Sequence, residues 1–318
     1  MGDTVAIAVV FPGQGTQQPG MALPWRDHPS WAIVEQAEAA LGEPLGHLIT
    51  DAPADALTRT REAQLAVLLT SLVVWDALAP IPGVPVAFAG HSLGQVTALI
   101  ASGALPLDAG VRFAARRAEL TQAAADAHPG KMAALLGATP EQADDACTAA
   151  PDACWVANDN APGQVVIAGT PEGVAAGSAR AQELGVRRVT ALNVGGAFHT
   201  PLMADATAGL QPEAAALDLA APAAPVVSNH DAVAYADAEG WRDRLPAHVS
   251  VPVRWRSTMD TLAGLGAITF LEVGHGSMLA ALAKRGAPTV VVQKISGPDD
   301  ITAYRANPAG IPTKLEVG

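Results

Sequence analysis

Short apolar runs, each of strand length, recur along the chain and are separated by longer segments with helical periodicity. The first two runs are 4–11 and 84–89. Runs without polar alternation are typical of parallel strands that are buried on both faces of a sheet. The alternation of strand and helix therefore predicts an α/β fold built on a parallel sheet. The other strands predicted for this sheet are 226–229, 268–273 and 289–292, and the main helices are 30–49, 62–79, 108–125 and 256–264.

The pattern changes between residues 127 and 194, where shorter elements follow one another. Strands are expected at 131–136, 155–158, 164–169 and 186–193, and helices at 139–149 and 170–184. The order β-α-β-β-α-β is typical of a ferredoxin-like unit. We therefore expect a small ferredoxin-like subdomain at 127–194, inserted into a large α/β-hydrolase-like domain formed by 1–126 and 195–318. The tail from residue 296 is rich in Gly, Pro and Asp and is expected to be peripheral.

One strand–turn–helix segment carries the strongest chemical signal. The second apolar run is followed by GHSLG at 90–94 and then by a helical segment. This is the Gly-x-Ser-x-Gly pattern of a nucleophile elbow, in which the glycines let the helix pass close to the strand. Ser92 would then stand at a helix N-terminus, where free N–H groups can stabilise an oxyanion. An ordinary strand-to-helix turn that happens to contain a serine is the alternative.

A serine hydroxyl needs a base to become a good nucleophile. Among the eight histidines, His199 has the best context, because it lies in a glycine-rich loop well after Ser92. His91 adjoins the serine, so its side chain is expected to point away and pack under the turn. No Asp or Glu between Ser92 and His199 follows a strand of the predicted main sheet, which favours a serine–histidine dyad over a hydrolase triad. The other candidate bases are His230, His248 and His275.

Composition and charge narrow the possible partners. The net charge of −12 and the pI of about 5.0 argue against nucleic acid or an anionic membrane as the main partner. The chain has no apolar run of about 18 residues and no basic N-terminal region, so neither a transmembrane helix nor a signal peptide is expected. Cys147 and Cys154 lack a metal-ligand partner at useful spacing and are expected to be reduced thiols. These features predict a cytoplasmic monomer without a bound metal.

Further short motifs are spread over nearly the whole chain. They are FPGQGTQ at 11–17, Gln64, Arg117 with Gln122, ANDNAPGQVV at 157–166, GAFHTP at 196–201, VVSN at 226–229, PVRW at 252–255 and LEVG at 271–274. Together with GHSLG, and in this order, they resemble the malonyl-CoA:acyl carrier protein transacylases, the acyltransferases of fatty acid and polyketide synthesis. The resemblance implies transfer of malonyl from malonyl-CoA to the phosphopantetheine thiol of an acyl carrier protein, through an acyl-serine ester. It implies a coenzyme A thioester as substrate and no bound cofactor.

The resemblance also implies roles in the reaction itself. Ser92 would carry the acyl group and His199 would be its base. The backbone carbonyl of His248 would hold the other ring nitrogen of His199, in agreement with the missing acid. The backbone N–H groups of Gln14 and Leu93 would form the oxyanion hole.

Other residues would bind the substrate. Arg117 would bind the free carboxylate of malonyl through two parallel hydrogen bonds. Gln64 would line the acyl pocket, and Asn160 would help to hold the pantetheine arm. Phe198 matches the Ala-Phe-His pattern of malonyl enzymes, whereas methylmalonyl enzymes tend to carry Ala-Ser-His.

Four positions depart from the usual pattern of this family. Gln95 stands where glutamate is usual and is expected to remove a negative charge near the acyl pocket. Ala118 replaces a glycine, His248 replaces a glutamine, and His275 replaces a proline. Two rival functions share the same motifs: a serine esterase or thioesterase, which has no need of Arg117, and a non-catalytic homologue that only docks carrier proteins.

Overall fold

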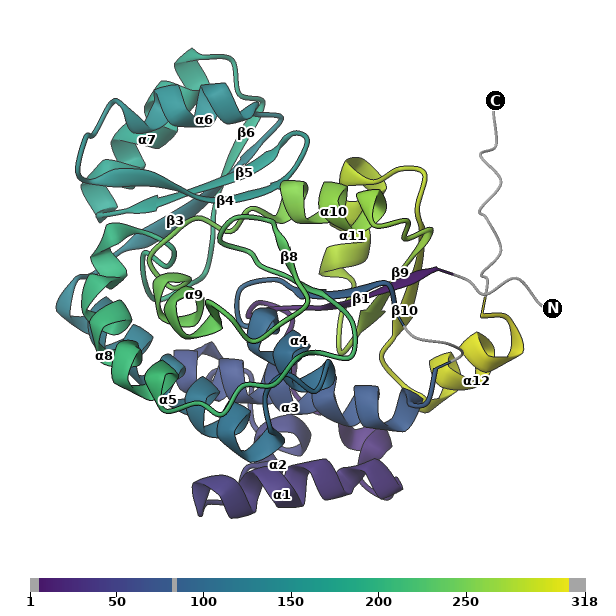
Figure 1. The fold of residues 1–318 in the computed structure, drawn as a ribbon. Helices are drawn as coiled ribbons and strands as arrows, with labels where there is room; N and C mark the ends of the chain where they lie inside the picture. The colour runs from purple at the N-terminus through teal and green to yellow at the C-terminus, as the bar shows by residue number, and fades with distance from the viewer. Residues whose placement is uncertain (1–5, 82–84, 309–318) are drawn as a thin grey trace.

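The computed structural model describes residues 6–81 and 85–308, and its centre is a six-stranded sheet (Figure 1). The strands are β1 (Ile7–Phe11), β2 (Ala87–Gly90), β7 (Val226–Val227), β8 (Ala234–Tyr235), β9 (Thr269–Val273) and β10 (Val291–Ile295). Their spatial order is β10-β9-β1-β2-β7-β8, and every neighbouring pair is parallel except β7 and β8. The predicted α/β fold with a parallel sheet is confirmed. Parts of the first two predicted strands, residues 4–5 and 84, lie outside the described residues.

The four inner strands, β1, β2, β7 and β9, are buried on both faces, as their apolar runs predict, whereas the edge strands β8 and β10 are mostly half-buried. Alternate residues of β1 point to opposite faces, because side chains alternate along a strand. Val9 and Phe11 enter a core that includes α3, α4 and α5, whereas Ala8 and Val10 enter a core with α10 and α11. These helices are α3 (Thr60–Leu78), α4 (Gly94–Ala101), α5 (Leu107–Ala127), α10 (Trp255–Gly264) and α11 (Met278–Gly286).

Several predicted boundaries in this part of the chain are wrong. The single helix expected at 30–49 is broken at Gly42, which ends α1 in the left-handed conformation. The tail is not wholly peripheral, because Ile301 and Tyr304 of α12 are buried in the core on the α3 side of the sheet, next to β10. Strand β8 and helix α9 were not predicted. The remaining helices are α1 (Ala32–Leu41), α2 (Gly46–Thr50), α8 (Ala204–Ala215), α9 (Trp241–Ala247) and α12 (Pro298–Ala306), with 3-10 turns at Leu23–Trp25, Pro29–Trp31, Ala56–Thr58 and Pro201–Met203.

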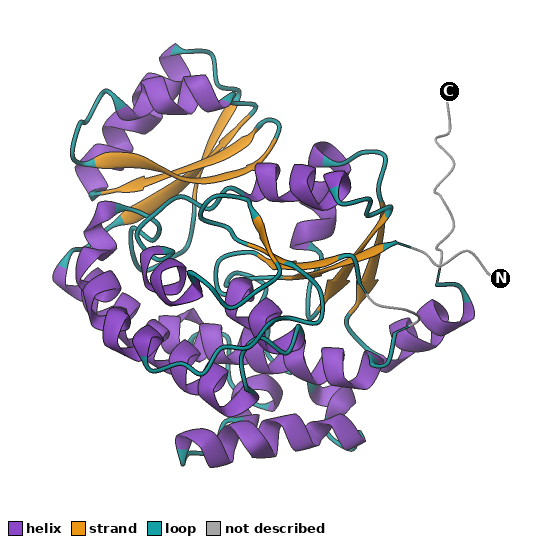
Figure 2. Ribbon diagram, in the orientation of Figure 1, coloured by secondary structure: helices purple, strands orange, loops and turns teal. Residues whose placement is uncertain are grey.

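A second, four-stranded sheet forms from the middle of the chain (Figure 2). Its elements are β3 (Lys131–Leu136), α6 (Pro140–Cys147), β4 (Cys154–Ala161), β5 (Gln164–Gly169), α7 (Pro171–Glu183) and β6 (Arg188–Ala191). The spatial order is β4-β5-β3-β6, and all neighbours are antiparallel. The two helices cover one face, and the other face packs against Ala197 and Phe198. This second face closes over the carboxyl ends of β1 and β2, where the candidate site lies.

The two sheets are also joined away from their chain connections. Val253, just before α10, pairs with β4: its N–H donates to the Ala157 carbonyl and its carbonyl accepts from the Asp159 N–H, both at 2.9 Å. Arg256 on α10 donates from Nε and Nη2 to Oδ2 of Asp159, at 2.9 and 2.7 Å. Among the helices of the described residues, none combines the length and the apolar character needed to cross a membrane.

Candidate active site

The turn between β2 and α4 brings Ser92 to the edge of the main sheet. Ser92 adopts φ of +52°, in the left-handed region that side chains disfavour. A side chain at Gly90 would overlap the carbonyl of Gly94, and one at Gly94 would overlap the carbonyl of Phe11. Both glycines are therefore required by the close approach of strand, turn and helix.

His199 faces Ser92 across a hydrogen-bond distance. Its Nε2 lies 2.8 Å from Ser92 Oγ, and its Nδ1 donates to the carbonyls of His248 and Val251, at 2.9 and 3.2 Å. These carbonyls hold the tautomer in which Nε2 is free to accept a proton. Burial, chiefly, and the positive charge of Arg117 lower the pKa of His199 to about 3, so the ring is neutral near pH 7.

Arg117 on α5 is the third group at Ser92. Its Nη2 donates to Ser92 Oγ at 3.2 Å, and its Nη1 donates to Oε1 of Gln64 at 2.6 Å. Burial lowers its pKa to about 10, so the guanidinium still carries its charge near pH 7. Within the described ranges, no carboxylate forms an ion pair with Arg117. A buried cation without a partner is costly, and an anionic ligand would offset that cost.

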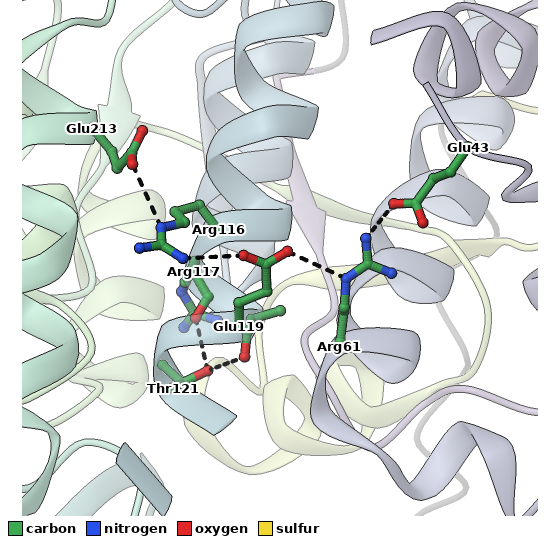
Figure 3. Close-up of polar contacts among 8 residues, drawn as sticks. Glu43, Arg61, Arg116, Arg117, Glu119, Thr121 and Glu213 are labelled. Atoms are coloured by element: carbon green, nitrogen blue, oxygen red, sulfur yellow. Dashed lines mark hydrogen bonds and ion pairs between the residues drawn. The ribbon is translucent and has the colours of Figure 1, made fainter. Parts of the chain in front are cut away.

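The neighbouring Arg116 has a different environment. Its side chain is exposed and bonds to Glu119 and to Glu213 on α8, at 3.2 and 3.5 Å. Figure 3 shows Arg116 pointing toward these carboxylates, with Glu119 also facing Arg61, which pairs with Glu43. The helix thus places one arginine in a surface ion network and the next in the site.

Ser92, His199 and Arg117 share one cavity of about 100 Å³ between the two sheets. Most of the predicted site residues meet there, including Gln14, Gln64 and Phe198. Gln64 thus faces the site instead of capping a neighbouring backbone, and its Nε2 lies 3.5 Å from Oε1 of Gln14. The rest of the lining is His91, Thr121, Met132, Asn158, Leu192, Val194 and Val249.

Two backbone N–H groups near Ser92 are free to bind an oxyanion. The N–H of Ser92 itself is occupied, because it donates to Oδ1 of Asn229 at 2.7 Å. Over residues 6–81 and 85–308, no hydrogen bond is found from the N–H of Leu93 or of Gln14. Leu93 precedes the first residue of α4, so its N–H belongs to the positive end of that helix.

One expectation about the residues around this turn needs correction, and one stays a prediction. Asn160 is buried, and its Oδ1 accepts from Nε2 of His91 at 2.8 Å; its contact with the pantetheine arm stays a prediction. Asn158, two residues earlier, lines the cavity, and its Oδ1 is buried without a partner among the described residues. His91 does not pack away under the turn, because its ring lines the cavity and reaches the small sheet.

Gln95, which stands where the family usually has glutamate, is buried and does not itself line the cavity. Its Oε1 accepts from the N–H of Asn229 at 2.9 Å. Sequence reasoning missed Asn158, Val251 and Asn229 as site residues. All three lie in or near quoted motifs, but nothing in those motifs indicates which side chain or carbonyl faces the serine.

Comparison with known proteins agrees with this geometry. A family model described as an acyl transferase domain matches residues 8–303. The chain belongs to the acyl transferase family. A malonyl CoA-acyl carrier protein transacylase of Bacillus subtilis (strain 168) is 35% identical over 300 residues, covering 93% of this chain and 95% of that protein.

Solved structures of such acyl transferases superpose over almost their full lengths. An acyl carrier protein S-malonyltransferase from Vibrio cholerae has a TM-score of 0.89 at 31% identity, over 93% of this chain and 99% of that one. A malonyl-transacylase in complex with a type II PKS acyl-carrier protein has a TM-score of 0.90 at 31% identity, over 95% of this chain and 99% of that one. The chain is therefore an acyltransferase enzyme. These relatives favour this activity over the esterase and the non-catalytic alternatives.

Proposed function

We propose that this acyl transferase moves a malonyl group from coenzyme A to the phosphopantetheine thiol of an acyl carrier protein, by way of a malonyl ester on Ser92. The observation that carries the proposal is the position of Arg117, a buried and unpaired cation in the described structure, within 3.2 Å of the Ser92 hydroxyl. A malonyl thioester differs from an acetyl thioester by one free carboxylate. That carboxylate is the partner that Arg117 lacks, and a guanidinium matches it through two parallel hydrogen bonds.

The chemistry follows from the contacts around Ser92. Ser92 Oγ attacks the thioester carbonyl while His199 Nε2 takes the hydroxyl proton. The carbonyl oxygen becomes an oxyanion that the N–H groups of Leu93 and Gln14 stabilise. The C–S bond breaks, and coenzyme A leaves as a thiol with the proton from His199. In the second half-reaction the carrier thiol gives its proton to His199, attacks the ester, and Ser92 recovers its hydroxyl hydrogen.

Arg117 also links substrate choice to the base. Its positive charge is one cause of the low pKa of His199. A bound malonyl carboxylate would compensate this charge, so that His199 becomes a stronger base when the correct substrate is present. An acetyl group would leave the charge, and the weaker base, in place.

The decisive experiment is intact-mass spectrometry of the enzyme after single-turnover mixing with malonyl-CoA or acetyl-CoA. Arg117→Ala should lower malonyl acylation by about 10²- to 10³-fold, the effect of removing one partner of a buried ion pair. Acetylation should be unchanged or faster, because the unpaired cation is gone. The malonyl-to-acetyl ratio of rates therefore collapses.

Arg116→Ala is the matched control, since it removes the same side chain from the adjacent residue. It should leave the ratio unchanged, because Arg116 lies in the surface network of Figure 3. Ser92→Ala should gain no acyl mass with either thioester. A Ser92→Ala protein that still becomes malonylated, or an unchanged ratio in Arg117→Ala, would contradict the proposed function.

Finer descriptions of the molecule follow the same family likeness. We assign the unit at 127–194 to the ferredoxin-like folds, supported by its βαββαβ order and its antiparallel sheet. We interpret the Ser92 turn as a nucleophile elbow and the surrounding domain as hydrolase-like, supported by the left-handed serine between strand and helix. The cytoplasmic location and the monomeric state stay predictions.

A further inference from the structure

The turn that presents Ser92 is held from outside by one side chain. The carboxamide of Asn229 accepts from the Ser92 N–H through Oδ1 and donates to the Gly90 carbonyl through Nδ2, both at 2.7 Å. Its two partners lie on either side of His91. A left-handed backbone at a residue with a side chain persists only where surrounding contacts enforce it. Asn229 supplies two such contacts, one on each arm of the turn.

Asn229 is itself fixed in place. Its side chain is buried, at 1% exposure, and it lies two residues after the end of β7. Because β7 is the parallel neighbour of β2, the carboxyl ends of both strands lie at the same edge of the sheet. Its N–H donates to Oε1 of Gln95 at 2.9 Å, and its carbonyl accepts from the N–H of Arg254 at 3.0 Å. Gln95 is also buried, and it is the second residue of α4, the helix that follows Ser92.

We propose that Asn229 is a positioning residue for the nucleophile, and that Gln95 sets the orientation of Asn229. The carboxamide holds Ser92 at the angle from which its hydroxyl meets His199. It also occupies the Ser92 N–H, which leaves the N–H groups of Leu93 and Gln14 for the oxyanion. The inference rests on the proposed role of Ser92, but it concerns residues to which the transfer mechanism assigns nothing.

The carboxamide is required because one end must accept and the other must donate. An ionised aspartate at this position accepts at both ends, so it would repel the Gly90 carbonyl. A protonated aspartic acid could donate again. In Asn229→Asp the acylation rate should therefore depend on pH, because only the protonated side chain can donate to the Gly90 carbonyl.

Other ionisable groups near position 229 could also make the rate depend on pH. The titratable or charged side chains nearby are His91, His199, His230, Asp231, Arg254 and Arg117, which lie along the turn, on the loop of Asn229, on the facing elements and at the start of α10. Burial lowers the pKa values of His91 and His199, so both rings are already neutral at pH 7. A new pH dependence near neutrality in Asn229→Asp would therefore report the new carboxyl group.

The test measures two rates between pH 5 and 9: malonylation of Ser92 by intact mass, and labelling by a fluorophosphonate, which needs no carboxylate recognition. Asn229→Asp should be within a few-fold of the wild-type enzyme at low pH and lose about 10²-fold as the buried carboxyl ionises, the size of effect expected from a misplaced reactive group. Asn229→Ala should be slow at every pH. Asp231→Asn, on the same loop, should keep the wild-type profile.

A second pair of variants changes Gln95 and leaves Asn229 itself intact. Gln95→Leu removes the acceptor for the Asn229 N–H and should slow both reactions about tenfold, whereas Gln95→Glu retains an acceptor and should not. A wild-type profile in Asn229→Asp, or equal rates in Gln95→Leu and Gln95→Glu, would overturn the inference. Failure of the wild-type enzyme to gain malonyl would instead overturn the proposed function, and fluorophosphonate labelling would still test the positioning of Ser92.

Discussion

Ser92 and His199 face each other in one cavity, and both adopt positive φ, at +52° and +62°. The chain holds them by different means. The Ser92 backbone is held by its own strand, turn and helix, and the Asn229 side chain braces that turn from outside. His199 is held by a distant segment: its N–H donates to the carbonyl of Val249, and its ring donates to the carbonyls of His248 and Val251.

The segment that holds His199, residues 248–256, also joins the two sheets, and we call it the seam. Two residues after Val251, Val253 pairs with β4, and Arg256 then bonds to Asp159 of that strand. The position of His199 therefore depends on how the small sheet sits on the large one. The position of Ser92 depends on its own strand, turn and helix and on Asn229, all within the large domain. Variants at three places probe this difference: His199 itself, the ion pair between Arg256 and Asp159, and His248.

Removal of the base should have the largest effect. His199→Ala should lower the acylation rate by about 10²- to 10⁴-fold, the usual contribution of a general base. In the wild-type enzyme the rate should stay level as the pH falls from 8 through 6.5, because the pKa of His199 is about 3 and the ring stays neutral. Single-turnover acylation from pH 8 to 5 measures both. A decline centred near pH 6.5 would contradict the lowered pKa of His199, and the same decline in the residual rate of His199→Ala would show that another group is responsible.

Loosening the seam should have a smaller effect on the base. Arg256→Gln removes a partly buried ion pair and should slow acylation about three- to tenfold, because the segment that holds His199 is released from β4. Asp159→Asn should do the same, and the two effects should not add in the double variant. Arg254→Gln, an exposed neighbour, is the control. If the rate losses of the two single variants add in the double variant, or if Arg254→Gln loses as much, the ion pair does not act through the position of His199.

The smallest effect on acylation is expected at His248, whose contribution to the site is its backbone carbonyl. His248→Gln should acylate at the wild-type rate. Burial, first, and neighbouring positive charges hold the pKa of His248 well below 6.5. The unfolded chain then binds a proton that the folded chain does not, so stability is lost as the pH falls through 6.5.

Each such histidine contributes about 1.4 kcal/mol per pH unit to the slope of the free energy of unfolding below that pH. His248→Gln should reduce the slope by about one such contribution. Denaturant titrations between pH 7.5 and 5 measure it. A steep loss of acylation, with the slope unchanged, would mean that the imidazole itself serves the reaction.

Sequence reasoning was most accurate where the constraint is local. The continuous runs around Val9 and Phe88 predicted buried parallel strands, since a strand covered on both faces needs apolar residues throughout. A helix was expected at 139–149, and the side chain of Thr139 starts it by forming a capping box with Gln142. The break at Gly42 and the packed helix α12 were missed, because helical periodicity continues past a glycine and a polar tail can still bury a few residues such as Tyr304.

By itself the sequence determined the parallel sheet, the turn at Ser92 and, through its motifs, the residues that gather around it. These features depend on side-chain period and on glycine, which act over a few residues. Tertiary structure alone decided which partners those residues meet. Asn229 braces a turn 137 residues away, His248 holds a histidine 49 residues away, and Asn160 of the small sheet reaches His91. Such contacts follow from the packing of one sheet on the other, which no local pattern records.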